Sequence, residues 1–272
     1  MKLDSLDHVH FSVSDLGRAQ TIFGPWVPGE FTPVYGSEAL NAFGVWNMSG
    51  LDFIQVLDPA EPAFGGARIE GQGILSVSFR VDDIDEGIRA AEAAGLRLRS
   101  RVGSEDIGMG KNVVQAQFHP SGSFDLGLEL VERQIPGDPH VPLDRDSVAY
   151  VEHTLADLDV ATQFFAGFLG APFSAPFEDQ ALGSRSVRNE RYGIQLTMPT
   201  RPDGVVGERL QSRGPGLHAI AFQSGDLDRD VASARDRGLS LAWQREIATG
   251  VREAEFDPES GMILRLVERS GA

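Results

Sequence analysis

The sequence predicts an α+β fold built from four βαβββ modules, and three observations indicate it. First, the two halves of the sequence are related by an internal repeat. The segment "GQGILSVSFRVDDIDEGIRAAEAAGLRL" from Gly71 matches "GPGLHAIAFQSGDLDRDVASARDRGLSL" from Gly214, at an offset of 143 residues. Second, in each copy an alternating strand leads into an amphipathic helix, and short strands separated by Gly, Pro, Ser and Asn follow. Third, the same order recurs more weakly inside each half, so the module occurs four times.

The modules of the first half begin with two related segments. "LDHVHFSVSDL", residues 6–16, alternates as a strand does and ends in Asp-Leu, where a helix is expected to start. "DDIDEGIRAAEAAG" has an Asp near its start and Gly95 as its C-terminal stop, which predicts the helix of the second module. "FIQVLDP" from Phe53 and "FHPSGSFDLGLELVER" from Phe118 are expected to end the first and second modules as strands.

The second half repeats each of these segments. "YVEHTLADLDVATQFFA" from Tyr150, "GIQLTMP" from Gly193 and "FDPESGMILRLVER" from Phe256 match the first strand, the middle strand and the last strand of the first half. Between the halves, "RQIPGDPHVPLDRDS" has three prolines and no apolar period, which is typical of a linker. We therefore expect a first domain at 1–132, a linker at 133–147 and a second domain at 148–272.

Composition limits the function classes. The chain has no cysteine, which excludes disulfides, thiolate metal ligands and cysteine nucleophiles. A formal charge of −16 would repel phosphate backbones, so we expect no nucleic-acid partner. The N-terminus has no apolar core of signal-peptide length, and no apolar stretch is long enough to span a membrane. We therefore expect a cytoplasmic protein that acts on a small-molecule substrate and has no membrane partner. A homodimer remains open, because a second chain could supplement a half-open barrel.

The four modules resemble the vicinal oxygen chelate superfamily, which includes glyoxalase, methylmalonyl-CoA epimerase and the extradiol dioxygenases. "LDHVHFSVSDL" and "LSVSFRVDDID" resemble its first-strand signature, and "HPSGSFDLGLELVE" resembles its last strand. The resemblance covers nearly the whole chain. It implies that the modules pair into two glyoxalase-like half-barrel domains of mostly antiparallel strands, with the helices outside.

The resemblance also implies a metal site in the first half. The family's ligand positions fall on His8, Gln55 and Glu129, and the glutamine is most like the epimerase branch. The fourth position falls on Ser76, a poor ligand, so we assign it to substrate binding and expect a weak site. Such a site would hold one divalent ion (Mn, Co, Fe, Zn or Ni), or no metal at all. His10 lies on the same strand face as His8, and we expect His10 or Glu129 to transfer a proton.

The second half lacks this ligand set. Tyr150 stands in place of the first histidine, Gln195 matches Gln55, and the next position falls on Ala219. Arg265 stands where Glu129 stands in the first half, and an arginine would repel a cation and favour an anion. We therefore expect Tyr150 and Arg265 to bind substrate or to have a structural role, without a metal.

Three functions follow as hypotheses. The first is a lyase, isomerase or epimerase that acts on a small oxygenated carbon acid through an enolate. The second is an extradiol ring-cleaving dioxygenase, whose iron site in the second half would need His153, His218 and Glu268 to slip in strand register. The third is a non-catalytic small-molecule binding protein. Metal analysis of the purified protein distinguishes these three.

Overall fold

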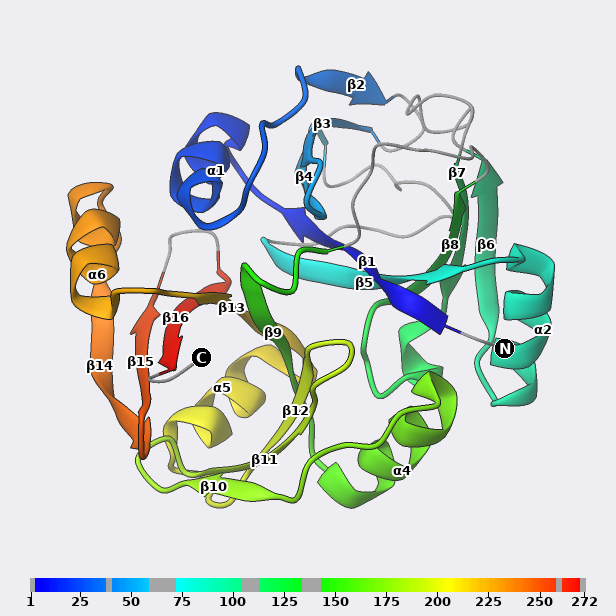
Figure 1. Cartoon of the computed structure of the whole chain (residues 1–272). Helices are drawn as coiled ribbons and strands as arrows, with labels where there is room; N and C mark the ends of the chain where they lie inside the picture. The colour runs from blue at the N-terminus through cyan, green and yellow to red at the C-terminus, as the bar shows by residue number, and fades with distance from the viewer. Residues whose placement is uncertain are drawn as a thin grey trace.

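The computed structural model of this chain describes residues 3–37, 41–58, 72–103, 113–133, 143–257 and 261–269. These residues form two mixed eight-stranded sheets, which Figure 1 shows packed against each other. The α+β fold with two glyoxalase-like half-barrels is therefore confirmed.

The first sheet has the strand order β2-β3-β4-β1-β5-β8-β7-β6. Its strands are β1 (Leu3–Ser12), β2 (Tyr35–Ser37), β3 (Ala42–Asn47), β4 (Leu51–Val56), β5 (Gly73–Val81), β6 (Leu98–Gly103), β7 (Val113–Phe118) and β8 (Leu128–Arg133). The antiparallel pair β1–β5 joins the two modules at the centre, and β4 and β8 lie parallel to β1 and β5. The first strand of each module thus lies between the last strand of its own module and the first strand of the other.

The second sheet repeats this order as β10-β11-β12-β9-β13-β16-β15-β14. Its strands are β9 (Val148–Thr154), β10 (Phe177–Asp179), β11 (Ser184–Asn189), β12 (Ile194–Pro199), β13 (Gly216–Gln223), β14 (Leu241–Ala248), β15 (Val251–Phe256) and β16 (Ile263–Arg269). The same order in both halves is the structural counterpart of the repeat in the sequence.

Four helices follow the first strands of the modules, as the sequence predicts. They are α1 (Leu16–Phe23), α2 (Ile84–Ala93), α4 (Leu158–Leu169) and α6 (Leu227–Asp236). Each begins at an N-cap aspartate whose carboxylate accepts a hydrogen bond from the backbone N–H three residues on: Asp15, Asp83, Asp157 and Asp226. Two short 3-10 helices, η1 (Gly24–Trp26) and η3 (Pro120–Gly122), are also present. The longest described helix has 12 residues, and none in the described part of the chain could span a membrane.

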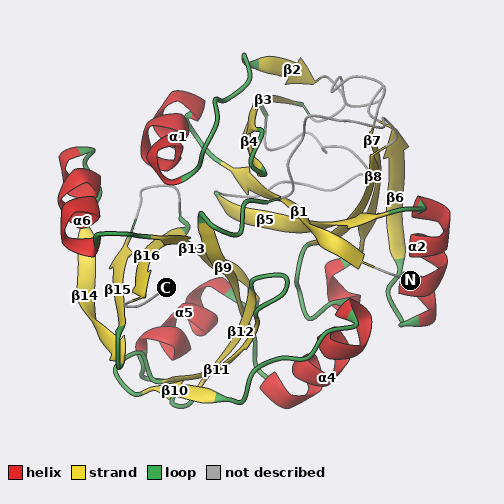
Figure 2. Ribbon diagram, viewed as in Figure 1, coloured by secondary structure: helices red, strands yellow, loops and turns green. Residues whose placement is uncertain are grey.

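A fifth helix, α5 (Val205–Arg213), was not predicted from the sequence. Figure 2 shows it beside β12, within the curve of the second sheet, whereas the four module helices lie outside the sheets. The corresponding segment of the first half, 59–71, lies outside the described residues. Among the described residues, a helix in this position occurs in the second half.

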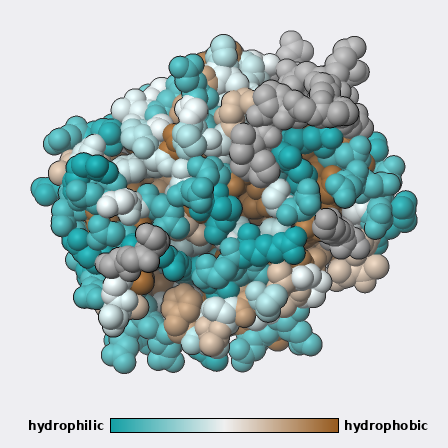
Figure 3. All heavy atoms as spheres, in the orientation of Figure 1, coloured by the Kyte–Doolittle hydropathy of each residue, from teal (hydrophilic) through white to brown (hydrophobic). Residues whose placement is uncertain are grey.

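The two halves share one apolar core. The Phe23 and Phe222 rings lie 6.0 Å apart across the halves, and the Tyr192 hydroxyl donates to the Leu3 carbonyl at 2.8 Å. His153, completely buried, lies 2.8 Å from the Phe124 carbonyl. Hydrophilic residues cover most of the face in Figure 3, in keeping with the net charge of −16.

The linker expected at 133–147 is described only at its ends. Arg133 is the last residue of β8 and pairs with Val113, so the first sheet extends one residue into the expected linker. Residues 134–142 lie outside the described residues, and Leu143 donates its N–H to the Leu6 carbonyl at 3.0 Å. The limits of the two domains remain predictions.

Candidate metal centre

Two neighbouring strands of the first sheet bring His8, His10 and Glu129 together. His8 and His10 alternate with buried Val9 and Phe11 on β1, so both imidazoles lie on the sheet face opposite α1. In the β1–β5 register His8 pairs with Ser78, which in turn pairs with Glu129 of β8.

The donor atoms of these three residues converge on one point. His8 Nε2 lies 2.6 Å from His10 Nε2, and His10 Nε2 lies 3.2 Å from a Glu129 carboxylate oxygen. One ligand atom from each of the three residues lies within 4.8 Å of the other two. This was the only such group of His, Cys, Asp or Glu side chains found among the residues that the structure describes.

A carboxylate contacts the Nδ1 atom of each imidazole, while the two Nε2 atoms face each other. His8 Nδ1 lies 2.7 Å from Asp7, and His10 Nδ1 lies 3.0 Å from Asp52. When each Nδ1 carries the proton that these carboxylates accept, the two Nε2 lone pairs face each other at 2.6 Å. A proton on one imidazole, or a metal ion between them, removes the repulsion. Imidazole ligands backed by carboxylates are the usual arrangement around protein metal ions, and the donor set fits a divalent transition ion.

Glu129 is fixed by three hydrogen bonds. Ser76 and Ser78 donate to its two carboxylate oxygens at 3.0 and 2.9 Å, and the Gln117 amide donates at 3.0 Å. Burial would raise the pKa of Glu129, but the charge and hydrogen bond of His10 outweigh it and lower the pKa to about 2. Glu129 is therefore an ionised, oriented donor at neutral pH.

The two histidines have opposite pKa shifts. Burial and the neighbouring His10 lower the pKa of His8. Burial also disfavours the charged form of His10, yet the Glu129 and Asp52 carboxylates outweigh it, so the pKa of His10 lies well above its usual range. His8 is thus the neutral ligand, and in the absence of a metal the proton belongs to His10.

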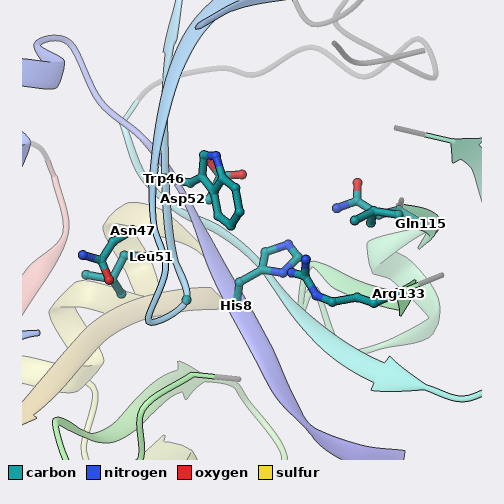
Figure 4. Close-up of a pocket in the computed structure, with 9 residues that line it drawn as sticks. His8, Trp46, Asn47, Leu51, Asp52, Gln115 and Arg133 are labelled. Carbon is teal, nitrogen blue, oxygen red and sulfur yellow. The ribbon is translucent and has the colours of Figure 1, made fainter. Parts of the chain in front are cut away.

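A pocket opens beside His8. It is small and partly open, with about 40 Å³ of cavity volume. It is lined by His8, Trp46, Asn47, Gly50, Leu51, Asp52, Val113, Gln115 and Arg133. Figure 4 shows Trp46 on one side of His8, and Arg133 and Gln115 on the other.

The structure brings together four of the residues that the sequence singled out in the first half. His8, His10, Glu129 and Ser76 form one cluster, with the Ser76 hydroxyl on Glu129. Gln55, predicted as a ligand, is not part of it. In the β3–β4 register Gln55 pairs with Phe43 and lies on the same strand face as buried Phe53, facing away from His10. The register therefore favours leaving Gln55 out of the ligand set, and its ligand role stays a prediction.

Asp52 takes the position expected of Gln55, and sequence reasoning missed it. It pairs with His10 across β1 and β4, as Gln195 pairs with Glu152 across β9 and β12. The signal was in the sequence: the offset of 143 residues between Gly71 and Gly214 leads from Gln195 back to Asp52. The local similarity between "FIQVLDP" and "GIQLTMP" aligns Gln195 with Gln55, which lies three residues after Asp52.

In the second half, the hollow inside the curve of the second sheet contains a buried network of ion pairs and no candidate metal centre among the described residues. Arg265 donates to Glu152 at 2.7 Å, to Glu255 at 2.9 Å and to the Tyr150 hydroxyl at 3.2 Å. Arg209 of α5 adds a bond of 3.1 Å to Glu255. Arg265 and Tyr150 therefore lie together, as expected, but the carboxylates on Arg265 belong to this chain. The structure gives no support to a substrate anion there.

The charges in the second hollow stabilise one another. Burial would raise the pKa of Glu152, but Arg265 outweighs it and lowers the pKa to about 2. Burial and Glu253 raise the pKa of Tyr150, whose hydroxyl donates to that carboxylate at 3.1 Å. Burial lowers the pKa of His153 and of His218 to about 4, so both are neutral. With Arg265 at its centre, this hollow suits no cation.

The fold of this chain is also found in a solved structure. No protein-family model matches this chain, and no curated protein matches it. Across its whole length the chain superposes on a triple mutant of 4-hydroxymandelate synthase from Streptomyces coelicolor, with TM-score 0.71, 18% identity and 94% of the synthase covered. Methylmalonyl-CoA epimerase from Mycobacterium tuberculosis matches 46% of this chain and 88% of its own, with 27% identity and TM-score 0.43.

The full-length superposition settles the architecture. The synthase is a vicinal oxygen chelate protein, so the resemblance inferred from the sequence is confirmed at the level of the fold. The chain therefore has the fold of a vicinal oxygen chelate protein, and two imidazoles and a carboxylate converge beside a pocket in its first half, where they form a candidate metal centre.

Proposed function

We propose that this chain is an enzyme that binds one divalent metal ion through His8, His10 and Glu129 and acts on a small molecule in the adjoining pocket. The convergence of two carboxylate-backed imidazoles and an ionised glutamate carries this proposal. It changes one expected role: His10, expected to transfer a proton, becomes a ligand because its Nε2 lies 2.6 Å from that of His8.

The surrounding side chains would hold this site in shape. Asp7 and Asp52 fix the imidazole orientations, while Ser76, Ser78 and Gln117 hold the carboxylate of Glu129. A divalent ion bound there would act as a Lewis acid toward substrate oxygens and stabilise an oxyanion. The limited size of the pocket and its apolar walls of Trp46, Leu51 and Val113 restrict water around the substrate.

The reaction class that this arrangement supports best is a lyase, isomerase or epimerase reaction through an enolate. A carboxylate oxygen of Glu129 would accept the proton from the carbon next to a carbonyl, and the charge left on the carbonyl oxygen is where a fixed cation stabilises the enolate most. Glu129 is buried and ionised at neutral pH, as a base must be before it accepts a proton.

Carbon-bound proton exchange tests this function. The protein loaded with Mn²⁺ or Co²⁺ would be incubated in D₂O with a hydroxyketone, a dicarbonyl and an acyl thioester, and exchange followed by NMR. We expect exchange for one of these classes with the wild type and a loss of at least about a hundredfold for Glu129→Gln. Metal binding without exchange in any class would contradict the enolate chemistry and leave the metal site intact.

A second candidate is an iron-dependent ring-cleaving dioxygenase. Two histidines and one carboxylate are the donor set of non-haem iron oxygenases, which favours this reading in the first domain. The dioxygenase hypothesis drawn from the sequence placed the iron site in the second domain. There Arg265, bonded to Glu152, stands at the position that corresponds to Glu129. Oxygen uptake by Fe²⁺-loaded protein with catechol would favour the dioxygenase, and its absence together with exchange would favour the enolate reaction.

A further inference from the structure

Another cavity lies on the side of the first sheet that faces away from the candidate metal centre. It has about 250 Å³ of cavity volume, several times that of the pocket beside His8, and it is lined by residues 13–15 and by α1. Val13 is buried with Phe11 in the core beneath α1, whereas His10 lies on the opposite face of β1. The sheet therefore separates this cavity from the metal centre.

The cavity combines an apolar wall with a polar rim. Its wall is formed by four buried side chains, those of Val13, Ala19, Ile22 and Phe23. Arg18, one turn before Ile22 on α1, also lines the cavity, and its side chain is partly exposed. Apolar walls with a few polar groups are typical of small-molecule sites. The cavity therefore suits a ligand that has an apolar body and one polar end.

The guanidinium of Arg18 bonds to neutral groups. Nη1 donates to the Arg237 carbonyl at 2.6 Å and Nη2 to the Gly238 carbonyl at 3.5 Å, where α1 lies beside the end of α6 (Figure 1). Among the described residues, no carboxylate forms an ion pair with Arg18, and its Nε donates no hydrogen bond. Asp15, which also lines the cavity, caps α1 by accepting the Arg18 backbone N–H at 2.9 Å. Two of the five N–H donors of this guanidinium are therefore in use, and its charge is unpaired.

The fourth module shows an arginine at the same position with a carboxylate partner. Arg229 is three residues after the N-cap aspartate of α6, as Arg18 is three residues after that of α1. The guanidinium of Arg229 pairs with Asp230 at 3.0 Å, and its side chain is 69% exposed. In α1 the residue after the arginine is Ala19, which lines the cavity. The local sequence thus leaves the charge of Arg18 available beside an apolar cavity.

We propose that this cavity is a second binding site, which takes a small carboxylic acid with an apolar body. The carboxylate accepts hydrogen bonds from the guanidinium of Arg18, and the apolar body contacts Ile22 and Phe23. Because Arg18 also bonds to Arg237 in the second half, the ligand binds where the two halves meet. This inference does not rest on the proposed function, since the site shares no residue with the metal centre.

Calorimetric titration of the full chain with 3-phenylpropionate tests this inference. The probe has a carboxylate for Arg18 and a ring for the apolar wall, and 3-phenylpropanamide is its neutral counterpart. The titration would compare the wild type with Arg18→Gln and Arg229→Gln. The latter is a matched control, because it removes the same charge at the same position of a module helix but lies outside this cavity. Each titration would be repeated with Co²⁺ present.

We expect Arg18→Gln to weaken binding of the acid tenfold or more, and Arg229→Gln to change it less than twofold. The amide should bind the wild type at least tenfold more weakly than the acid, and Co²⁺ should change the affinity for the acid less than twofold. Arg18→Lys, which keeps the charge, should retain part of the affinity and shows that the loss in Arg18→Gln is not loss of the fold.

Four results would overturn the inference: no saturable binding of the acid, equal effects of the two glutamine variants, equal binding of acid and amide, or loss of binding in the presence of Co²⁺. The last of these would place the acid at the metal centre. Absence of Co²⁺ binding would instead contradict the proposed function and leave the second site intact.

Discussion

The buried charge network of the second domain makes the acid stability of this protein predictable. Glu152 is 1% exposed and bonded to Arg265, and its pKa lies near 2 in the fold against 4.5 for the free side chain. A depressed carboxyl pKa stabilises the fold above the unfolded value of 4.5. This contribution is lost as the pH falls from 4.5 towards 2.

The size of the effect follows from the two pKa values. The shift corresponds to about 3 kcal/mol of folding free energy at neutral pH. At pH 3 most unfolded chains have bound this proton while the folded protein has not, so about 2 kcal/mol of that contribution is already gone. The variant Glu152→Gln has no such proton to bind. It should be less stable than the wild type at pH 7 but lose about 2 kcal/mol less between pH 7 and pH 3.

Urea denaturation at pH 7 and pH 3, followed by circular dichroism, measures the difference. Glu208→Gln, at an exposed position of α5, is the control and should keep the wild-type pH dependence. A wild-type pH dependence in Glu152→Gln would refute the view that the Arg265 network sets this part of the stability.

Three further predictions concern the first domain and the core. Gln55→Ala should leave Co²⁺ affinity within twofold of the wild type in a calorimetric titration, whereas Glu129→Gln should lower it at least tenfold; a large effect of Gln55→Ala would restore the ligand role that the strand register denies it. Asp7→Asn should weaken Co²⁺ binding by about 10- to 100-fold in the same assay, because the imidazole of His8 loses its carboxylate partner, and unchanged affinity would argue against that support. Phe222→Ala should lower the free energy of unfolding by about 3–5 kcal/mol in urea titrations, because it leaves a cavity beside Phe23 in the core that both halves share; a loss below about 1 kcal/mol would show that the halves are not energetically joined there.

The architecture could be predicted because it depends on features that repeat. Each module helix starts at an aspartate, and each strand before it alternates, so four local signals agreed. Helix α5 escaped prediction because its nine residues have little apolar periodicity. Its position depends on tertiary contacts such as that of Arg209 with Glu255.

The site was only partly predictable, for a reason of register. His8, His10 and Glu129 were found because each lies on a strand with clear alternation, which fixes the face of the side chain. Asp52 and Gln55 lie three residues apart on β4, so their side chains point to opposite faces of the sheet. The register of β4 against β1 decided between them, and it comes from long-range pairing. Asp7 and Arg133 were missed because no local pattern shows that their side chains meet.

The most direct test of the central claim is the anomalous diffraction of crystals soaked in Co²⁺. We predict one strong peak per chain within about 2.0–2.3 Å of Nε2 of His8, Nε2 of His10 and a carboxylate oxygen of Glu129. Crystals without a peak there, or with a peak bound by other side chains while these three remain hydrogen-bonded to one another, would contradict it.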